Sequence, residues 1–244
     1  MKLRVFTLCS GYDSQCLALD ELKRNHPDFD YELIGWSEID KYASQAHDAL
    51  YPQWSDRNYG DMTKIDWNEV PDFDLLTFST PCQDISTAGL QRGIAEGSDT
   101  RSAIVWKVLD CVEIKRPKYL LQENVKALVG KKFLPFYTEF NRRLEAMGYS
   151  VFGQIMNAKD YGVPQNRERV FVVSIHNFDG IYTFPSKQEL KVTLNDVLED
   201  EVAESYYLKD ETVQKYLDKV KANEAEGKGF GFFPETPSAT SAEQ

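Results

Sequence analysis

Two kinds of hydrophobic pattern alternate along the chain. Short apolar runs that end in small polar residues predict strands, and longer stretches with apolar residues three or four positions apart predict helices. The predicted strands span residues 3–8, 31–36, 73–78, 119–121, 150–155 and 170–175. Helical stripes lie between most of these runs, for example Ile104, Val108 and Val112. Strands that alternate with helices predict an α/β fold with a doubly wound, mostly parallel sheet.

The pattern changes near residue 193. An acidic stretch (199–204) follows, then a predicted exposed helix over 210–221 and a segment rich in Gly and Phe (227–233). The last residues, 234–244, give no fold signal. We therefore expect a main domain of residues 1–192 and a second region of residues 193–244.

Composition narrows the class of protein. The chain has 244 residues, enough for one α/β domain with a sizeable core, and a formal net charge of −11. An acidic average argues against a general nucleic-acid binder, although a local basic groove can coexist with it. No apolar stretch is long enough for a transmembrane helix, and the N-terminus does not resemble a signal peptide. The four cysteines have no metal-ligand spacing, and we expect no disulfides, no metal and a cytoplasmic location.

The strand over 73–78 leads into the sequence Ser-Thr-Pro-Cys-Gln. In open α/β sheets, chemistry lies just past the carboxyl ends of strands, and Cys82 lies at that place. Pro81 fixes its own φ and keeps Thr80 extended, so the backbone before the thiol is held. Gln83 and Ser86 add polar groups beside it. The alternative is a cysteine that only packs.

The first two predicted strands also end in polar groups. The turn over residues 9–14 can carry the charged groups of a cofactor on its backbone donors, although it has one glycine where dinucleotide sites have three. Glu38 follows the second strand, the usual place for a carboxylate that binds ribose hydroxyls. Asp61 is placed to accept from an adenine amino group. Either carboxylate can instead be a solvated or capping side chain.

Two further segments carry charge near predicted strands. Glu123-Asn124 ends the short strand over 119–121, where a carboxyl group must be paired, solvated or functional. Gln165, Arg167 and Arg169 enter the last strand at alternate positions and are expected to share one face. The alternative for the two arginines is an ordinary surface cluster.

Taken together and in order, these segments resemble the motifs of the C5-cytosine-specific DNA methyltransferases, over about residues 3–176. The segments that carry the resemblance are the Cys9–Tyr12 turn, Glu38, Asp61, Pro81-Cys82-Gln83, Asp99–Ile104, Glu123-Asn124-Val125 and Gln165-x-Arg167-x-Arg169. The chain departs from the family in the first turn, where Cys9 replaces an aromatic residue and Asp13 and Ser14 replace the second and third glycines.

The resemblance implies a Rossmann-like fold that binds S-adenosylmethionine and releases S-adenosylhomocysteine. It implies that Cys82 adds to C6 of a cytosine flipped out of double-stranded DNA, with Glu123, Arg167 and Arg169 as the other catalytic residues. The implied cofactor-binding residues are Cys9, Ser10, Gly11, Tyr12, Asp13, Ser14, Glu38, Ile39, Asp61, Met62, Pro81 and Ile104. The implied DNA-contacting residues are Gln83, Ser86, Arg92, Arg101, Asn124 and Gln165.

The resemblance also implies a biological setting. We expect a monomeric modification enzyme of a restriction-modification system, with a cognate restriction endonuclease as partner. Residues 193–244 are then the start of a target-recognition region or a flexible tail. Alternatives are the same chemistry on tRNA and an inactive or split partner subunit, although Cys82 and Glu123 are both present. A cysteine hydrolase is disfavoured because none of the three histidines lies in a recognisable motif.

Overall fold

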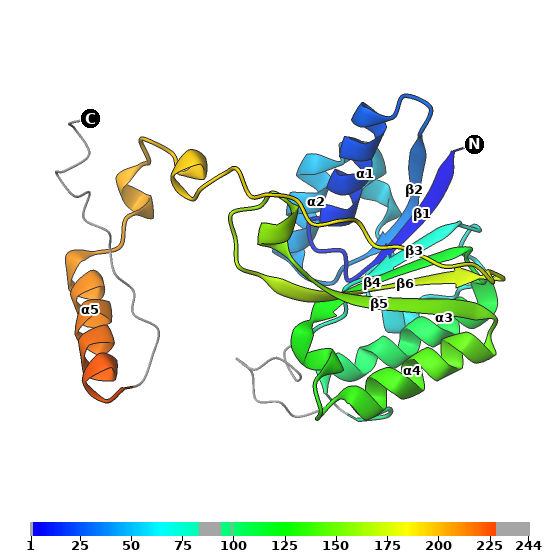
Figure 1. Cartoon of the computed structure of the whole chain (residues 1–244). Coiled ribbons are helices and arrows are strands. Elements are labelled where there is room, and N and C mark those ends of the chain that lie inside the picture. The colour runs from blue at the N-terminus through cyan, green and yellow to red at the C-terminus, as the bar shows by residue number, and fades with distance from the viewer. Residues whose placement is uncertain (1, 83–93, 99, 228–244) are drawn as a thin grey trace. The chain divides into compact units, whose positions relative to one another are not determined.

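The computed structural model describes residues 2–82, 94–98 and 100–227. The chain divides into two compact units, Met1–Thr193 and Leu194–Gln244. The first unit contains a six-stranded sheet in the order β2-β1-β3-β4-β6-β5 (Figure 1). Its strands are β1 (Leu3–Leu8), β2 (Tyr31–Ser37), β3 (Leu75–Phe78), β4 (Tyr119–Val125), β5 (Tyr149–Asn157) and β6 (Glu168–His176).

Helices connect these strands. The α-helices of the first unit are α1 (Ser14–Asn25), α2 (Lys41–Leu50), α3 (Lys107–Lys115) and α4 (Leu134–Ala146). Its short 3₁₀ helices are η1 (Pro52–Arg57), η2 (Met62–Lys64), η3 (Arg101–Trp106), η4 (Lys126–Val129) and η5 (Ala158–Tyr161). Helix α1 lies on one face of the sheet, and α3 and α4 lie on the other (Figure 1).

The pairing of the strands gives the sheet a topological switch point. β1 pairs in parallel with both β2 and β3, and β3 pairs in parallel with β4, whereas β6 runs antiparallel to its neighbours β4 and β5. The chain moves from β1 to one side of the sheet and from β3 to the other, so the order reverses between these two strands. Ligands of open α/β sheets bind outside the carboxyl ends of the strands at such a point. The predicted doubly wound, mostly parallel α/β fold is confirmed.

Strand β4 is longer than its apolar run predicts. The sequence suggests that the strand ends at Leu121, but the ladder continues because β6 pairs with it, with Glu123 opposite Phe171 and Val125 opposite Arg169. The alternation of charged and buried residues in this stretch hides the strand in the sequence. Glu123 therefore lies on a rigid strand near its carboxyl end.

Two apolar clusters form the core. The larger contains the predicted helical stripes, including Val108, Val112, Phe140 and Leu144, packed with residues of the sheet such as Phe78. The smaller surrounds β2, and its buried members are Val5, Cys16, Tyr31, Leu33, Trp36 and Tyr51. The first cluster anchors β3 and β4, and the second anchors the end of β2. The carboxyl ends of these strands, where ligands of such sheets bind, therefore rest on buried structure.

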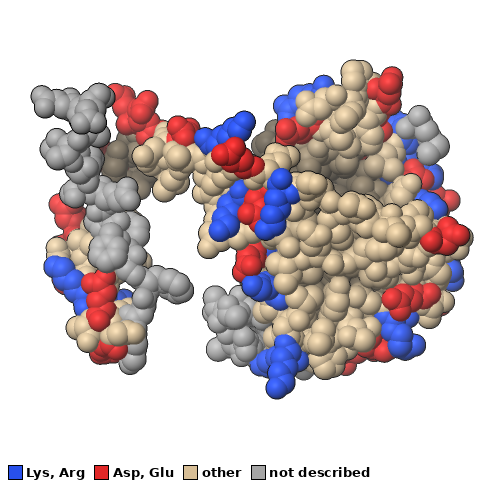
Figure 2. Space-filling view, in the orientation of Figure 1, with Lys and Arg blue, Asp and Glu red and all other residues tan. Residues whose placement is uncertain are grey.

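The second unit contains η6 (Asn195–Val197), η7 (Glu204–Tyr206) and α5 (Asp210–Ala225). The predicted exposed helix over 210–221 is confirmed and extends to residue 225; no residue of α5 is buried. In the part of the chain that the structure describes, no helix is both long and apolar enough to cross a bilayer. In the first unit, a broad area of the visible face carries few charged side chains, and acidic and basic groups alternate along its rim (Figure 2).

Candidate active site

The turn after β1 has an unusual backbone. Cys9, Gly11 and Asp13 have φ values of 53°, 58° and 63°, in the left-handed region. This conformation costs about 1–2 kcal/mol for a residue with a side chain, although Asp adopts it more readily than most. The turn aims the Gly11 N–H at Glu38, which accepts it at Oε2 over 2.9 Å. The ends of β1 and β2 are thereby joined.

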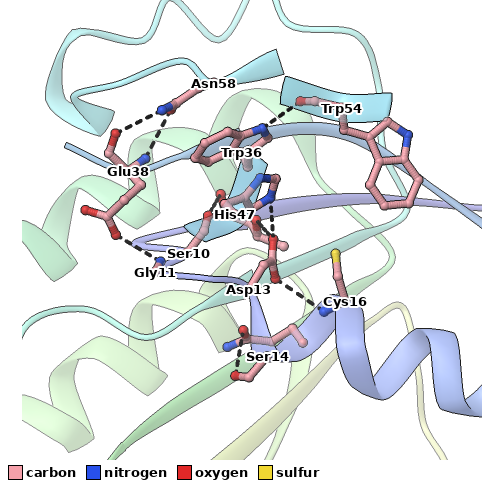
Figure 3. A network of polar contacts seen from close by, with 12 residues as sticks. Ser10, Gly11, Asp13, Ser14, Cys16, Trp36, Glu38, His47, Trp54 and Asn58 are labelled. Carbon is pink, nitrogen blue, oxygen red and sulfur yellow. Dashed lines mark hydrogen bonds and ion pairs between the residues drawn. The ribbon is translucent and has the colours of Figure 1, made fainter. Parts of the chain in front are cut away.

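Glu38 is fixed at the end of β2 by backbone groups. Its Oε1 accepts from the amides of Ile39 and Asp40, each over 2.8 Å. Asn58 holds the Glu38 backbone through both its amide oxygen and its amide nitrogen (Figure 3). The carboxylate is therefore oriented in advance, while Glu38 remains only half-buried.

A cavity of about 990 Å³ opens beside Glu38. Ile39, Pro81 and Ile104 line it with apolar surface, and Arg101 also lines it. The Ile39 side chain is 76% exposed, which is unusual for an apolar residue at the end of a buried strand. A carboxylate that can accept from a diol, next to open apolar surface, suits a ribose joined to a flat base. This donor set therefore fits the adenosine part of S-adenosylmethionine.

Asp61 and Met62 lie in the turn beside this cavity, which Thr63 lines. The Asp61 carboxylate accepts from the Thr63 hydroxyl and amide, over 2.8 and 3.0 Å, and these bonds lower the pKa of Asp61. Met62 is 4% exposed, and its sulfur lies 3.8 Å from the Cys9 sulfur. Its side chain thus belongs to the core, and it contacts the turn after β1 through Cys9.

A second cavity, of about 910 Å³, brings together segments that are far apart in the sequence. Cys9, Ser10, Tyr12 and Ser14 from the first turn line it, together with Glu123 and with Gln165, Arg167 and Arg169. The Arg169 Nε lies 3.0 Å from the Glu123 Oε1, with about a quarter of each side chain exposed. The predicted acid and the predicted arginine pair therefore share one hollow.

Cys82 lies on the segment that leaves β3, held from two sides. The Thr80 carbonyl accepts from the Asn124 side-chain amide over 3.2 Å, and the Pro81 carbonyl accepts from the Ser102 hydroxyl over 2.7 Å. The thiol itself is half-buried at the edge of the larger core. Because Phe78 pairs with Gln122, the next residues of the two strands place this segment beside Glu123. The predicted contacts Gln83, Ser86 and Arg92, and Asp99 of the Asp99–Ile104 segment, lie outside the described residues.

The other three thiols are poor nucleophiles. Burial, reinforced by the charge of Glu38, raises the pKa of Cys9 to about 12. Burial also raises the pKa of Cys16, with Asp13 adding to the effect, and the pKa of Cys111. These thiols stay protonated at neutral pH, where the thiolate is the reactive form. Its position at the carboxyl edge of β3 leaves Cys82 as the candidate nucleophile.

Several predicted site residues are buried in the protein. Asn124 is 3% exposed; its amide nitrogen binds Thr80 and its oxygen accepts from the Val125 amide. Both polar atoms of Asn124 thus have partners inside the protein, which gives it a part in positioning the Cys82 segment, and its DNA contact stays a prediction. Ser10 is 7% exposed and Asp13 is fully buried, so their side chains support the turn over residues 9–14 from inside the protein.

Three residues with clear structural roles are not among the site residues predicted from the sequence. Asn58 holds Glu38, Ser102 holds Pro81, and His47 lies against Asp13. Each acts on a partner at least 20 positions away, so the contact depends on how the helices pack onto the sheet. Among the described residues, no group of His, Cys, Asp and Glu has the arrangement of a metal site.

Comparison with protein families decides the relationship. Residues 3–242 match the sequence profile of the family described as C-5 cytosine-specific DNA methylase. The chain belongs to this family. The resemblance predicted over about residues 3–176 is therefore confirmed, and the match extends beyond it to residue 242.

Two curated members of this methylase family have a similar sequence. Type II methyltransferase M2.ScrFI of Lactococcus lactis subsp. cremoris is 44% identical over 195 residues, which are 80% of this chain and 54% of the relative. Type II methyltransferase M.NlaX of Neisseria lactamica is 36% identical over 203 residues, 83% of this chain and 63% of the relative. The chain thus spans between about half and two thirds of the length of these relatives.

Solved structures share the fold of this chain. The S. pombe Dnmt2 methyltransferase has a TM-score of 0.68 at 20% identity, covering 89% of this chain and 66% of its own. The Entamoeba histolytica methyltransferase EhMeth has a TM-score of 0.71 at 19% identity, and the match covers 88% of this chain and 65% of EhMeth. At this identity the similarity establishes the fold alone.

Proposed function

We propose that this chain, as part of its whole protein, methylates C5 of cytosine in DNA and serves as the modification enzyme of a restriction-modification system. One observation carries the proposal: the Cys82 segment is held at the topological switch point, beside the ion pair of Glu123 and Arg169. Membership of the family and the type II methyltransferases among the relatives support it.

Residues in and beside the first cavity suit the methyl donor, S-adenosylmethionine. Glu38 accepts from the ribose hydroxyls, Ile39 packs on the adenine, and Asp61 accepts from the adenine amino group. When bound, this cofactor supplies an electrophilic methyl group and leaves as S-adenosylhomocysteine. The turn over residues 9–14 leads from this cavity to the second one, where its backbone donors receive the amino-acid end of the cofactor.

Cys82 is the nucleophile in this proposal. Cytosine C5 is unreactive while the ring is aromatic, so the Cys82 thiolate forms a C–S bond at C6 and the C5=C6 electron pair moves onto C5. Glu123 holds the N3 and N4 edge of the base and stabilises the shift of charge. Once C5 carries its methyl group, loss of the C5 proton to solvent and departure of the Cys82 sulfur restore the ring.

Two arginines and two residues that hold the Cys82 backbone complete the base site. Arg169 orients Glu123 through their 3.0 Å ion pair and contacts O2 of the base, with Arg167 behind it. A cytosine inside a duplex cannot reach this hollow, so it must flip out at a cost of about a few kcal/mol. Asn124 and Ser102 hold the backbone on either side of Pro81 so that the thiol meets the base at a fixed place.

The second unit, Leu194–Gln244, is assigned in this proposal to the start of the target-recognition region. A restriction endonuclease that cuts the same sequence is the implied partner, and the protein works as a monomer. These assignments follow the family and the type of the relatives.

A methylation assay tests the proposal. The whole protein is incubated with methyl-labelled S-adenosylmethionine and either duplex DNA or tRNA, and the nucleosides are identified by mass spectrometry. We expect 5-methylcytosine in DNA, its loss in Cys82→Ser, and its retention in the control Cys111→Ala. Label found in tRNA alone would replace the DNA function. Normal binding of S-adenosylhomocysteine without methylation of either substrate would indicate a regulatory subunit.

A further inference from the structure

A buried carboxylate occupies a backbone position that suits glycine. Asp13 has φ 63° and ψ 63° at the start of α1, and its side chain is completely buried. The methyltransferase motif that this turn resembles has glycine in its place. The left-handed conformation costs a side-chain-bearing residue about 1–2 kcal/mol unless its surroundings compensate. The contacts of the carboxylate show what compensates.

Groups from two secondary-structure elements hold the Asp13 carboxylate, and a third element lies against it. The Thr7 hydroxyl on β1 donates to Oδ2 over 2.7 Å, and the Cys16 amide in α1 donates to Oδ1 over 3.3 Å. The imidazole Nε2 of His47, from α2, lies 3.6 Å from Oδ2 (Figure 3). A carboxylate removed from water is tolerated only with such partners. The turn is therefore tied to both flanking helices.

His47 depends on this contact in turn. Its ring stacks on Trp36 at a centroid distance of 3.6 Å and lies 5.2 Å from the ring of Tyr51, and it is fully buried. Within the described part of the chain neither ring nitrogen has a hydrogen-bond partner, which makes the Asp13 carboxylate the polar group that it faces. Removing one member of a buried pair is costly because the other is left uncompensated.

The pair sits between the two halves of the cofactor site. Asp13 ends the turn whose Gly11 amide binds Glu38 over 2.9 Å. His47 lies in α2, which begins directly after Glu38, Ile39 and Asp40. A change in the Asp13–His47 contact is thus transmitted to the amide and to the carboxylate that meet at the cofactor.

We propose that Asp13 and His47 form a buried clamp that holds the first turn and α2 in the arrangement that binds S-adenosylmethionine. Asp13 does through its side-chain contacts what glycine does through conformational freedom. Both are positioning residues, since neither reaches the cofactor. This inference rests on the proposed function, because the ligand is the cofactor of that reaction.

Glycine at position 13 separates the clamp from a simple backbone effect. Asp13→Gly removes the strain of the left-handed residue but also removes the carboxylate. If conformational freedom is what the turn needs, this variant binds as well as the wild type. If the clamp holds the turn, affinity for S-adenosylhomocysteine falls about tenfold, the factor that corresponds to ordering one residue.

Calorimetry with S-adenosylhomocysteine on the whole protein is the test. Asp13→Gly and His47→Leu are each expected to weaken binding about tenfold, and the double variant no further than Asp13→Gly alone, because loss of the carboxylate already removes the contact with His47. His47→Gln keeps an N–H donor and is expected to recover part of the affinity, and it also serves if His47→Leu does not fold. His26→Leu, at an exposed position, is the matched control. Wild-type affinity in Asp13→Gly, or additive losses in the double variant, would overturn the clamp.

Hydrogen exchange of the ligand-free protein separates this inference from the proposed function. The amides of Gly11 and Cys16 should exchange faster in Asp13→Gly and in His47→Leu than in the wild type or in His26→Leu. Unchanged exchange would overturn the clamp even if the cofactor binds. If the wild type does not bind S-adenosylhomocysteine at all, the proposed function fails, and the exchange rates still decide whether the clamp exists.

Discussion

The Arg169 guanidinium Nε lies 3.0 Å from the Glu123 carboxylate Oε1, across the antiparallel strands β6 and β4. Arg169 stands opposite Val125, so Glu123, two residues earlier, presents its side chain to the same face of the sheet. The ion pair fixes the carboxylate at the mouth of the second cavity. It thereby links the register of two strands to the proposed base site.

Breaking this pair should slow methylation more than it weakens the fold. Arg169→Ala leaves Glu123 without its partner, and we expect kcat to fall about a hundredfold, the scale for loss of one preorganised electrostatic group. Steady-state methylation of duplex DNA measures the effect. Arg142→Ala, which breaks an exposed pair with Glu139 on α4, is the matched control and should keep wild-type kcat. Equal kcat values in the two variants would remove Arg169 from the site.

Asn124 should act on the Cys82 segment from inside the protein. Asn124→Ala leaves the buried Thr80 carbonyl without this donor, at a cost of about 1–3 kcal/mol in the free energy of unfolding. We also expect lower kcat with unchanged affinity for S-adenosylhomocysteine. Urea unfolding and calorimetry measure the two quantities, with the exposed Asn25→Ala as control. A variant that loses DNA affinity but keeps both stability and kcat would support the DNA contact suggested by the sequence.

Glu38 should contribute to cofactor affinity through its charge. Hydrogen bonds to charged groups contribute about 1.5–3 kcal/mol, so Glu38→Ala should weaken S-adenosylhomocysteine binding by about ten- to a hundredfold. Glu38→Gln keeps the size of the side chain but not its charge, and its affinity for S-adenosylhomocysteine should lie between those of Glu38→Ala and the wild type. Glu113→Ala, on the exposed side of α3, is the control for calorimetry. Wild-type affinity in Glu38→Ala would reject the ribose assignment.

The thiols should differ in how their alkylation depends on pH. Burial raises the pKa of Cys9 to about 12 and also raises those of Cys16 and Cys111, so their thiolate fractions stay small below pH 9. Brief treatment of the native protein with iodoacetamide at pH 7.5 should therefore label the Cys82 peptide first, as peptide mass mapping can show. Labelling of Cys9 should stay low throughout the range from pH 7.5 to pH 9. Early labelling of Cys16 or Cys111 would show that the buried thiols are more accessible than the structure indicates.

The sequence predicts those parts of the fold and site that depend on local pattern. Apolar runs predict the strands, and a polar residue after a run predicts a place at the carboxyl edge, as for Glu38 and Cys82. The convergence of Glu123 with Arg169 is implied by the family resemblance, and in the structure it arises because β4 and β6 pair in one sheet.

Other features depend on tertiary packing and leave no local signal. Glu123 lies inside β4 because β6 pairs alongside it, which a short apolar run does not reveal. Asn124 faces inward because its amide meets the Thr80 carbonyl on the neighbouring segment. His47 reads as an isolated histidine in a helix, and its contact with Asp13 arises only when α2 packs beside the first turn.

Covalent trapping tests the central claim, that Cys82 is the nucleophile, most directly. Duplex DNA containing 5-fluorocytosine is incubated with the whole protein and S-adenosylmethionine; the fluorine blocks the final proton loss, so the protein–DNA adduct persists. We predict one adduct that survives denaturation, with the DNA attached to the Cys82 peptide and no adduct in Cys82→Ser. DNA attached to a peptide containing Cys9, Cys16 or Cys111, or undiminished trapping in Cys82→Ser, would contradict the account.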